Sequence, residues 1–146
     1  MLQRLRALQE ASATARPVRL MRGLWISGAV GASSVYLLQH LGVTHILNAT
    51  EDLLLPEPSY GFTVLRCPLR DVEEEDIGQF FLPAAEFIDA GLASGGSVLV
   101  HCHAGRSRSC SLVLAWLMRH RGWVAAAPAC WPGGGCGMPG DVVCHR

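Results

Sequence analysis

The chain has 146 residues with 12 basic and 12 acidic side chains, so its formal net charge is zero. This balance argues against nucleic acid and anionic membrane surfaces as partners. Half of the residues are hydrophobic, and the length is that of one domain with a buried core. No run approaches the roughly eighteen apolar residues of a membrane span, and the first residues lack the apolar core of a secretory signal. We expect a soluble protein of the cytoplasm, with the nucleus as a second compartment.

The first elements form a strand, helix and strand in sequence. Residues 1–17 alternate Arg with Leu and Ala, which predicts a flexible or short helical N-terminal arm. A short apolar run, 24–26, predicts the first strand. Ser33 is the expected N-cap of a helix that Gly42 ends, and residues 43–49 predict a buried strand. This order favours parallel pairing of the two strands.

The middle of the chain predicts a further strand and helix with an acidic loop between them. Residues 51–61 carry prolines and a glycine and predict a loop, and residues 62–67 predict a strand. Residues 69–76 are acidic and lie at the carboxyl end of that strand, where α/β folds place ligands. Asp76 or a neighbour is the expected cap of the next helix. Pro83 predicts a kink or a late start in this helix.

The stretch with the clearest chemical pattern begins at residue 98. An apolar strand, 98–100, leads into Cys102, a loop with Gly105 and Arg108, and a helix over 109–118. A loop that enters a helix N-terminus presents unpaired backbone N–H groups and the positive end of the helix dipole. The pattern therefore predicts an anion site, in which the planar guanidinium of Arg108 matches a pair of phosphate oxygens.

The same donors are expected to ionise Cys102. A free thiol is only slightly ionised at neutral pH, whereas thiols at helix N-termini or beside arginine have lowered pKa values. A thiolate in an anion cradle is a nucleophile for a bound phosphoryl group. Cys67 and Cys110 are expected to be packing residues.

At this point the sequence resembles a known family. The stretch from 101 to 109 resembles the His-Cys-x5-Arg-Ser signature of the cysteine-based protein phosphatases, and Ala104-Gly105 is similar to the atypical dual-specificity branch. The resemblance implies an α/β fold with a mostly parallel central sheet flanked by helices. It also implies phosphomonoester hydrolysis with no cofactor and no metal. The implied substrate is a phosphorylated protein, a kinase among the candidates, with dephosphorylation of phosphotyrosine and of phosphoserine or phosphothreonine.

The family pattern implies a role for each signature residue. Cys102 is the nucleophile, Arg108 holds the phosphoryl group, Ser109 assists departure of the thiolate, and His101 supports the loop by hydrogen bonds. An acid on an earlier loop protonates the leaving oxygen; Asp71 matches the family position best, and Asp76 is its rival. The backbones expected to bind phosphate belong to His103, Ala104, Gly105, Arg106, Ser107 and Arg108.

The resemblance covers residues 18–122, the expected catalytic domain. Residues 123–146 form an irregular tail rich in Gly, Pro and Cys that does not match the family's last two helices, so we expect a C-terminally truncated domain. Apolar surface on the helix after the signature, including Trp116 and Leu117, is then expected to be partly uncovered. Four tail residues have spacings unlike a zinc module: Cys130, Cys136, Cys144 and His145.

Three other functions remain open on the sequence alone. The truncated tail favours a phosphatase-like binding module with weak or no turnover. A sulfurtransferase also uses a cysteine in an anion loop, but Ser109 and Asp71 favour the phosphatase. A phosphoinositide or RNA phosphatase is a subsidiary alternative, and the loop lacks the lysines that favour polyanionic substrates.

Overall fold

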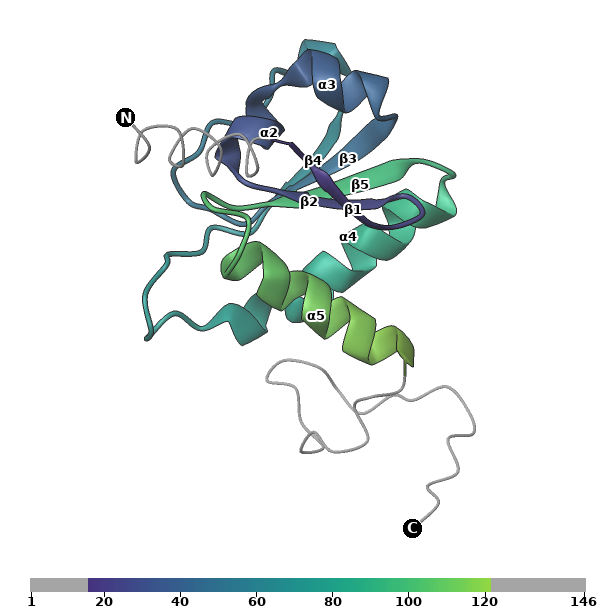
Figure 1. Ribbon diagram of the computed structural model, residues 1–146. Coiled ribbons are helices and arrows are strands. Elements are labelled where there is room, and N and C mark those ends of the chain that lie inside the picture. Colours follow the sequence, from purple (N-terminus) through teal and green to yellow (C-terminus); the bar gives the residue numbers. More distant parts are fainter. Residues whose placement is uncertain (1–15, 122–146) are drawn as a thin grey trace, which may run out of the picture.

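The computed structural model describes residues 16–121 (Figure 1). Its centre is a five-stranded sheet with the strand order β1-β2-β5-β3-β4. Strand β1 runs antiparallel to β2, and the other neighbours are parallel. The strands span Val18–Met21 (β1), Leu24–Ser27 (β2), Val43–Asn48 (β3), Thr63–Arg66 (β4) and Ser97–His101 (β5). The expected mostly parallel α/β architecture is therefore confirmed.

Helices cover both faces of this sheet (Figure 1). Helices α2 and α3 lie on one face, and α4 and α5 lie on the other. The α-helices span Ala29–Ser33 (α2), Val35–His40 (α3), Phe81–Ala93 (α4) and Arg108–Arg121 (α5), and two 3-10 helices span Pro58–Tyr60 (η1) and Ile77–Phe80 (η2).

The sheet has a hydrophobic core on each face, and successive side chains of its central strands point alternately into one core and the other. In β5, Val98 and Val100 pack with α4 and α5, whereas Leu99 between them packs with Leu38 of α3 on the other face. All of these side chains are buried. A strand buried on both faces reads as a continuous apolar run, which is why the motif strand is apparent in the sequence.

The carboxyl ends of the parallel strands lie level with one another. His101, the last residue of β5, pairs with Ser27 of β2 on one side and with Asn48 of β3 on the other. Asn48 in turn pairs with Arg66, the last residue of β4. The segments that leave these four strands therefore begin at one edge of the sheet, the edge where parallel sheets place their ligands.

A glycine on helix α4 faces the sheet where a side chain would not fit. A Cβ on Gly91 would lie 2.5 Å from a methyl carbon of Val98, closer than packed atoms allow. The helix begins at Phe81, so Pro83 occupies its first turn, where the missing N–H has no intrahelical acceptor. The expected late helix start is confirmed.

Several local predictions are wrong. Ser33 does not cap a helix that runs to Leu41: it ends α2, and Ser34 precedes the separate helix α3. Ser33 Oγ donates to the carbonyl of Val30 in its own helix, so it is not available as a cap. Asp76 precedes the 3-10 helix η2 and makes no side-chain capping bond.

The expectation for helix α5 is wrong for Trp116. Its side chain is buried, and its Nε1 donates to Asp89 of α4 at 2.8 Å. Leu117 is half-buried against the core. The exposed apolar side chains of this helix are Leu114 and Met118.

Two sequence predictions concern parts of the chain outside the described residues. These are most of the N-terminal arm, 1–15, and the tail with its cysteines, 122–146. Within residues 16–121, no helix is long and apolar enough to span a membrane.

Leu99 lies at the centre of the sheet and offers a direct test of this core. We expect Leu99→Ala to lower the free energy of unfolding by about 3 kcal/mol, because it removes a fully buried side chain and leaves a cavity. Leu54, 93% exposed, is the matched control, and Leu54→Ala should change the free energy by no more than about 0.5 kcal/mol. Urea unfolding measures both; equal losses would contradict the arrangement of the core.

Candidate active site

The loop that follows β5 is folded at the sheet edge where the parallel strands end. It runs from Cys102 to Ser107, and α5 begins at Arg108, so the predicted order of strand, loop and helix is confirmed. Cys102 is 2% exposed. We refer to residues 102–108 as the cysteine loop.

Gly105 sets the curvature of the cysteine loop. Its φ is +69°, a left-handed conformation that side chains disfavour. A Cβ at this position would also lie 2.7 Å from the carbonyl carbon of Ser27 and 2.8 Å from the nitrogen of Gly28. The loop is tied to the same segment by a hydrogen bond of 2.9 Å from the Ala29 N–H to the His103 carbonyl. Glycine is therefore required here by both conformation and space.

The curved loop directs hydrogen bonds toward the Cys102 sulfur. The Gly105 N–H donates to Sγ at 3.2 Å, and Ser109 Oγ lies 3.2 Å from Sγ. Burial on its own raises the pKa of the Cys102 thiol. Hydrogen bonds from the Ser109 hydroxyl and from backbone N–H groups of Ser109, Arg106 and Gly105 outweigh burial, so the pKa lies below its usual value. The geometry favours the thiolate, as a nucleophile requires.

The other described cysteines have the opposite character. Burial raises the pKa of Cys67 to about 12. Burial and the charge of Cys102 raise the pKa of Cys110. Cys67 is buried in the core, in agreement with the packing role predicted for it.

Arg108, the first residue of α5, is buried and hydrogen-bonded to the backbone at Leu69. It is 4% exposed, and its Nη1 donates to the Leu69 carbonyl at 2.9 Å. Its Nε has no hydrogen-bond partner within residues 16–121, and Asp71 Oδ1 lies 4.0 Å away. A buried guanidinium with an unused donor is a binding group for an anion, because the anion supplies the missing hydrogen bond.

The two candidate acids occupy different positions in the acidic loop. Asp71 is exposed and faces Arg108, whereas Asp76 lies at the start of η2. The loop between them is closed by Glu75, which accepts hydrogen bonds from the backbone N–H and the Nε of Arg70. The structure thus brings Asp71, the predicted acid, beside Arg108.

Asp52 is a site residue that sequence analysis missed. Its carboxylate oxygens lie 2.8 and 3.0 Å from Nε2 of His103, on the exposed side of the cysteine loop. The hydrogen bond with His103 lowers the pKa of Asp52. Arg66 holds the backbone of this segment by donating to the carbonyls of Glu51 and Leu53. The only sequence signal was an acid shortly after a predicted strand, and many ordinary surface carboxylates share that position.

His101 is buried below the loop, as its position in the motif suggested. Its main-chain carbonyl accepts a hydrogen bond from the Ala49 N–H at 2.8 Å. Its ring Nδ1, by contrast, has no partner among the described residues, so the expected ordering by side-chain hydrogen bonds is absent at that atom. Burial lowers the pKa of His101 to about 4, so the ring is neutral at pH 7.

These residues form a site for an anion with a thiolate at its centre. Backbone N–H groups and Arg108 supply positive charge, Cys102 supplies a sulfur whose pKa is lowered, and Asp71 supplies an exposed carboxyl. No group of three or more metal-ligating side chains occurs within residues 16–121. The arrangement is suited to phosphoryl transfer, in which positioning and charge stabilisation carry most of the catalysis.

Comparison of the sequence with models of protein families shows which family the chain belongs to. The family model described as dual specificity phosphatase, catalytic domain, matches residues 24–130. The chain belongs to this family.

Individual relatives agree with this assignment. The chain is 38% identical over 120 residues to dual specificity protein phosphatase PHS1 of Arabidopsis thaliana, covering 80% of this chain and 13% of that protein. It is 39% identical over 103 residues to human dual specificity protein phosphatase 4, covering 70% of this chain and 26% of that protein. The chain thus spans only part of these curated relatives.

Solved structures share the fold. The crystal structure of human DUSP28 superimposes with a TM-score of 0.67 at 34% identity, covering 73% of this chain and 71% of that one. Human tyrosine phosphatase-like serine/threonine/tyrosine-interacting protein superimposes with a TM-score of 0.68 at 33% identity, covering 74% and 76%.

The hydrogen bond between Ser109 and Cys102 predicts a pH shift in thiol reactivity. We expect iodoacetamide to alkylate Cys102 at lower pH than it alkylates an ordinary thiol, and Ser109→Ala to move the alkylation profile to higher pH, because one group that lowers the thiol pKa is removed. Ser111, which bonds the Ser107 carbonyl, provides the control Ser111→Ala with an unchanged profile. Mass spectrometry of the Cys102 peptide measures the rate; identical profiles for Ser109→Ala and wild type would contradict the assignment.

The buried neutral ring of His101 predicts acid sensitivity of the fold. Its pKa falls from 6.5 to about 4 on folding, so between these pH values the unfolded chain binds more protons. Stability therefore decreases as pH falls through this range, and the contribution of this group between pH 7 and pH 5 is about 2 kcal/mol. Urea unfolding of wild type and of His101→Asn at pH 7 and pH 5 measures the contribution of His101 to the pH dependence of stability. A pH dependence equal in the two proteins would refute the prediction, and the exposed His40→Asn serves as the control.

Proposed function

We propose that the chain is a protein phosphatase that hydrolyses phosphotyrosine and phosphoserine or phosphothreonine through a cysteinyl-phosphate intermediate. The observation that carries the proposal is the buried Cys102 sulfur, hydrogen-bonded by Gly105 and Ser109 beside the unused donor of Arg108. Family membership supports phosphatase chemistry at this site. The site residues require no cofactor for either step.

In the first step, the Cys102 thiolate attacks phosphorus. The N–H groups of the cysteine loop and the Arg108 guanidinium bind the phosphoryl oxygens, whose charge they stabilise during transfer. An S–P bond forms as the bond from phosphorus to the leaving oxygen breaks. Asp71 donates its proton to that oxygen, so the product departs as a neutral alcohol or phenol.

In the second step, water releases the phosphate. Asp71, now a carboxylate, accepts a proton from water as the water oxygen attacks phosphorus. The S–P bond breaks, and its electron pair returns to Cys102 as a thiolate. Ser109 Oγ, 3.2 Å from the sulfur, stabilises this leaving group by hydrogen bonding.

The partner we propose is a phosphorylated protein, with a kinase among the candidates, and the compartment is the cytoplasm or nucleus. The exposed rim formed by Asp71, Asp52 and His103 would meet the residues that flank the phosphorylated side chain. The activity of the whole protein is part of this proposal, since the chain covers 13% of PHS1 and 26% of phosphatase 4.

The role of Asp71 is tested with a matched pair of variants. We expect Asp71→Asn to lower kcat for a phosphotyrosine peptide by roughly 10²-fold or more, because the leaving phenolate goes unprotonated. Asp76→Asn removes an equivalent charge from the same loop and should leave kcat within about twofold. Steady-state kinetics measure both, and a larger loss from Asp76→Asn would transfer the acid role to Asp76.

The nucleophile is tested with Cys102→Ser. Wild-type protein should hydrolyse phosphotyrosine and phosphothreonine peptides in EDTA, and Cys102→Ser should abolish both activities. A wild-type protein that melts cooperatively and binds the peptides without turnover would favour the alternative function, a phosphatase-like binding module. This alternative is supported by one structural relative, whose name describes a tyrosine phosphatase-like interacting protein.

A further inference from the structure

Glu75 is a carboxylate turned back into the acidic loop, residues 69–76. Its side chain is 10% exposed, whereas residues 71–74 and Asp76 lie at the surface. Its Oε2 accepts hydrogen bonds from the backbone N–H of Arg70 at 3.2 Å and from Arg70 Nε at 2.9 Å. A carboxylate that leaves water loses free energy unless hydrogen bonds and an opposite charge compensate for the loss. Arg70 supplies both, so the position of the Glu75 side chain is well defined.

The peptide group between residues 69 and 70 is hydrogen-bonded on both sides. Its N–H, which belongs to Arg70, donates to Glu75, and its carbonyl, which belongs to Leu69, accepts from Arg108 Nη1 at 2.9 Å. A peptide group is planar and does not rotate about its own C–N bond, so one carboxylate and one guanidinium together fix its orientation. Asp71 is the next residue along the chain, and its backbone therefore starts from a fixed peptide.

Glu75 also contacts the chain on the other side of Asp71. The Glu75 N–H donates to the Val72 carbonyl at 3.2 Å, while the Glu75 side chain binds Arg70. The Asp71 carboxylate itself is 63% exposed and lies 4.0 Å from Arg108 Nε, which is longer than a hydrogen bond. The position of the Asp71 side chain therefore depends on the backbone that Glu75 holds at both neighbouring residues.

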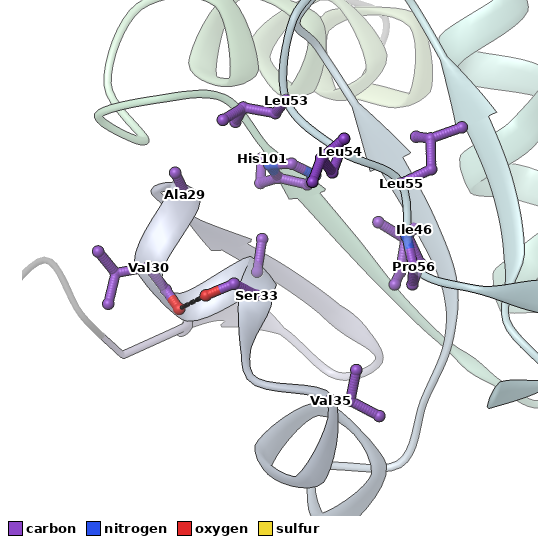
Figure 2. A pocket seen from close by; sticks show the side chains of 11 residues that line it. Ala29, Val30, Ser33, Val35, Ile46, Leu53, Leu54, Leu55, Pro56 and His101 are labelled. Atoms are coloured by element: carbon purple, nitrogen blue, oxygen red, sulfur yellow. Dashed lines mark hydrogen bonds between the residues drawn. The ribbon is translucent and has the colours of Figure 1, made fainter.

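The ends of the acidic loop are held by packing, and its middle is held by Glu75. Leu69 and Ile77 contact the core on the face of the sheet that carries α4 and α5. A hollow beside α2, lined in part by residues 53–56, lies on the opposite face and includes no residue of the acidic loop (Figure 2). Between its packed ends, the loop takes its shape from the hydrogen bonds of Glu75.

We propose that Glu75 is a positioning residue that holds Asp71 within reach of the leaving oxygen of the substrate. The proposal rests on the proposed function, in which Asp71 is the general acid. Proton transfer requires hydrogen-bond distance between the acid and the oxygen, and a displacement of about 1 Å is enough to lower the rate strongly. Glu75 does not touch the substrate and acts through the backbone on either side of Asp71.

Two substrates with different leaving groups test this role on the full chain. Phenyl phosphate releases a basic phenolate that needs a proton, whereas difluoromethylumbelliferyl phosphate releases an anion that is stable without one. The value of kcat/KM reports the first step, in which the leaving oxygen is protonated, and the ratio of the two values does not depend on the fraction of folded enzyme. We expect Glu75→Ala to lower kcat/KM for phenyl phosphate at least about tenfold more than for the second substrate.

Three further variants make the measurement specific to the hydrogen bonds of Glu75. Glu75→Gln keeps an oxygen that accepts from Arg70, so its ratio should stay within about threefold of the wild-type ratio. Glu74→Ala removes an exposed carboxylate from the adjacent position and should leave both kcat/KM values unchanged. Glu75→Met keeps the length of the side chain without an acceptor, and it provides the same test if Glu75→Ala does not fold.

Asp71→Asn separates failure of this proposal from failure of the proposed function. The proposal is supported if Asp71→Asn and Glu75→Ala both lower kcat/KM selectively for phenyl phosphate and the double variant loses little more than Asp71→Asn alone. If Asp71→Asn shows the selective loss but Glu75→Ala affects both substrates equally, or neither, Glu75 does not position the acid and the proposal is overturned. If Asp71→Asn itself shows no selective loss, Asp71 is not the acid, and the proposed function fails at that step together with this proposal.

Discussion

The site depends on the close contact between Gly105 and the backbone of Ser27 and Gly28. This contact joins the loop after β5 to the end of β2, and it is possible because the strands end level with one another. With a side chain at residue 105 the loop would have to move away from β2, and the Gly105 N–H would no longer point at the Cys102 sulfur. The hydrogen bonding of the Cys102 sulfur and the path of the loop into α5 both depend on this contact between two backbones.

The parts of the molecule that were predictable from sequence are those encoded locally. The buried strands β3 and β5 are continuous apolar runs, and the loop with Cys102 and Arg108 lies within nine consecutive residues. Asp71 was identified because a family pattern supplied its position, and the structure places it 4.0 Å from Arg108. Pattern alone could not have chosen between Asp71 and Asp76, because both lie in one acidic loop.

The features that escaped prediction depend on neighbours distant in sequence. Asp52 contacts His103, 51 residues away, only because β3 and β5 are adjacent in the sheet. Strand β1 has exposed side chains throughout, so it lacks the burial pattern that marks a strand. The interpretation of Trp116 was wrong for a similar reason: Asp89 on α4 accepts its N–H, and α4 covers it, although nothing near Trp116 in sequence indicates either.

The hydrogen bond from Arg108 to the Leu69 carbonyl couples two segments of the site. Leu69 is buried two residues before Asp71, so one backbone carbonyl orients Arg108, the proposed anion-binding group, and belongs to the loop that carries Asp71, the proposed acid. A mutation that shifts this carbonyl alters both groups together, and the effects of changes at Leu69, Asp71 and Arg108 would not be additive. These residues lie on two separate segments of the chain, yet they act as one unit.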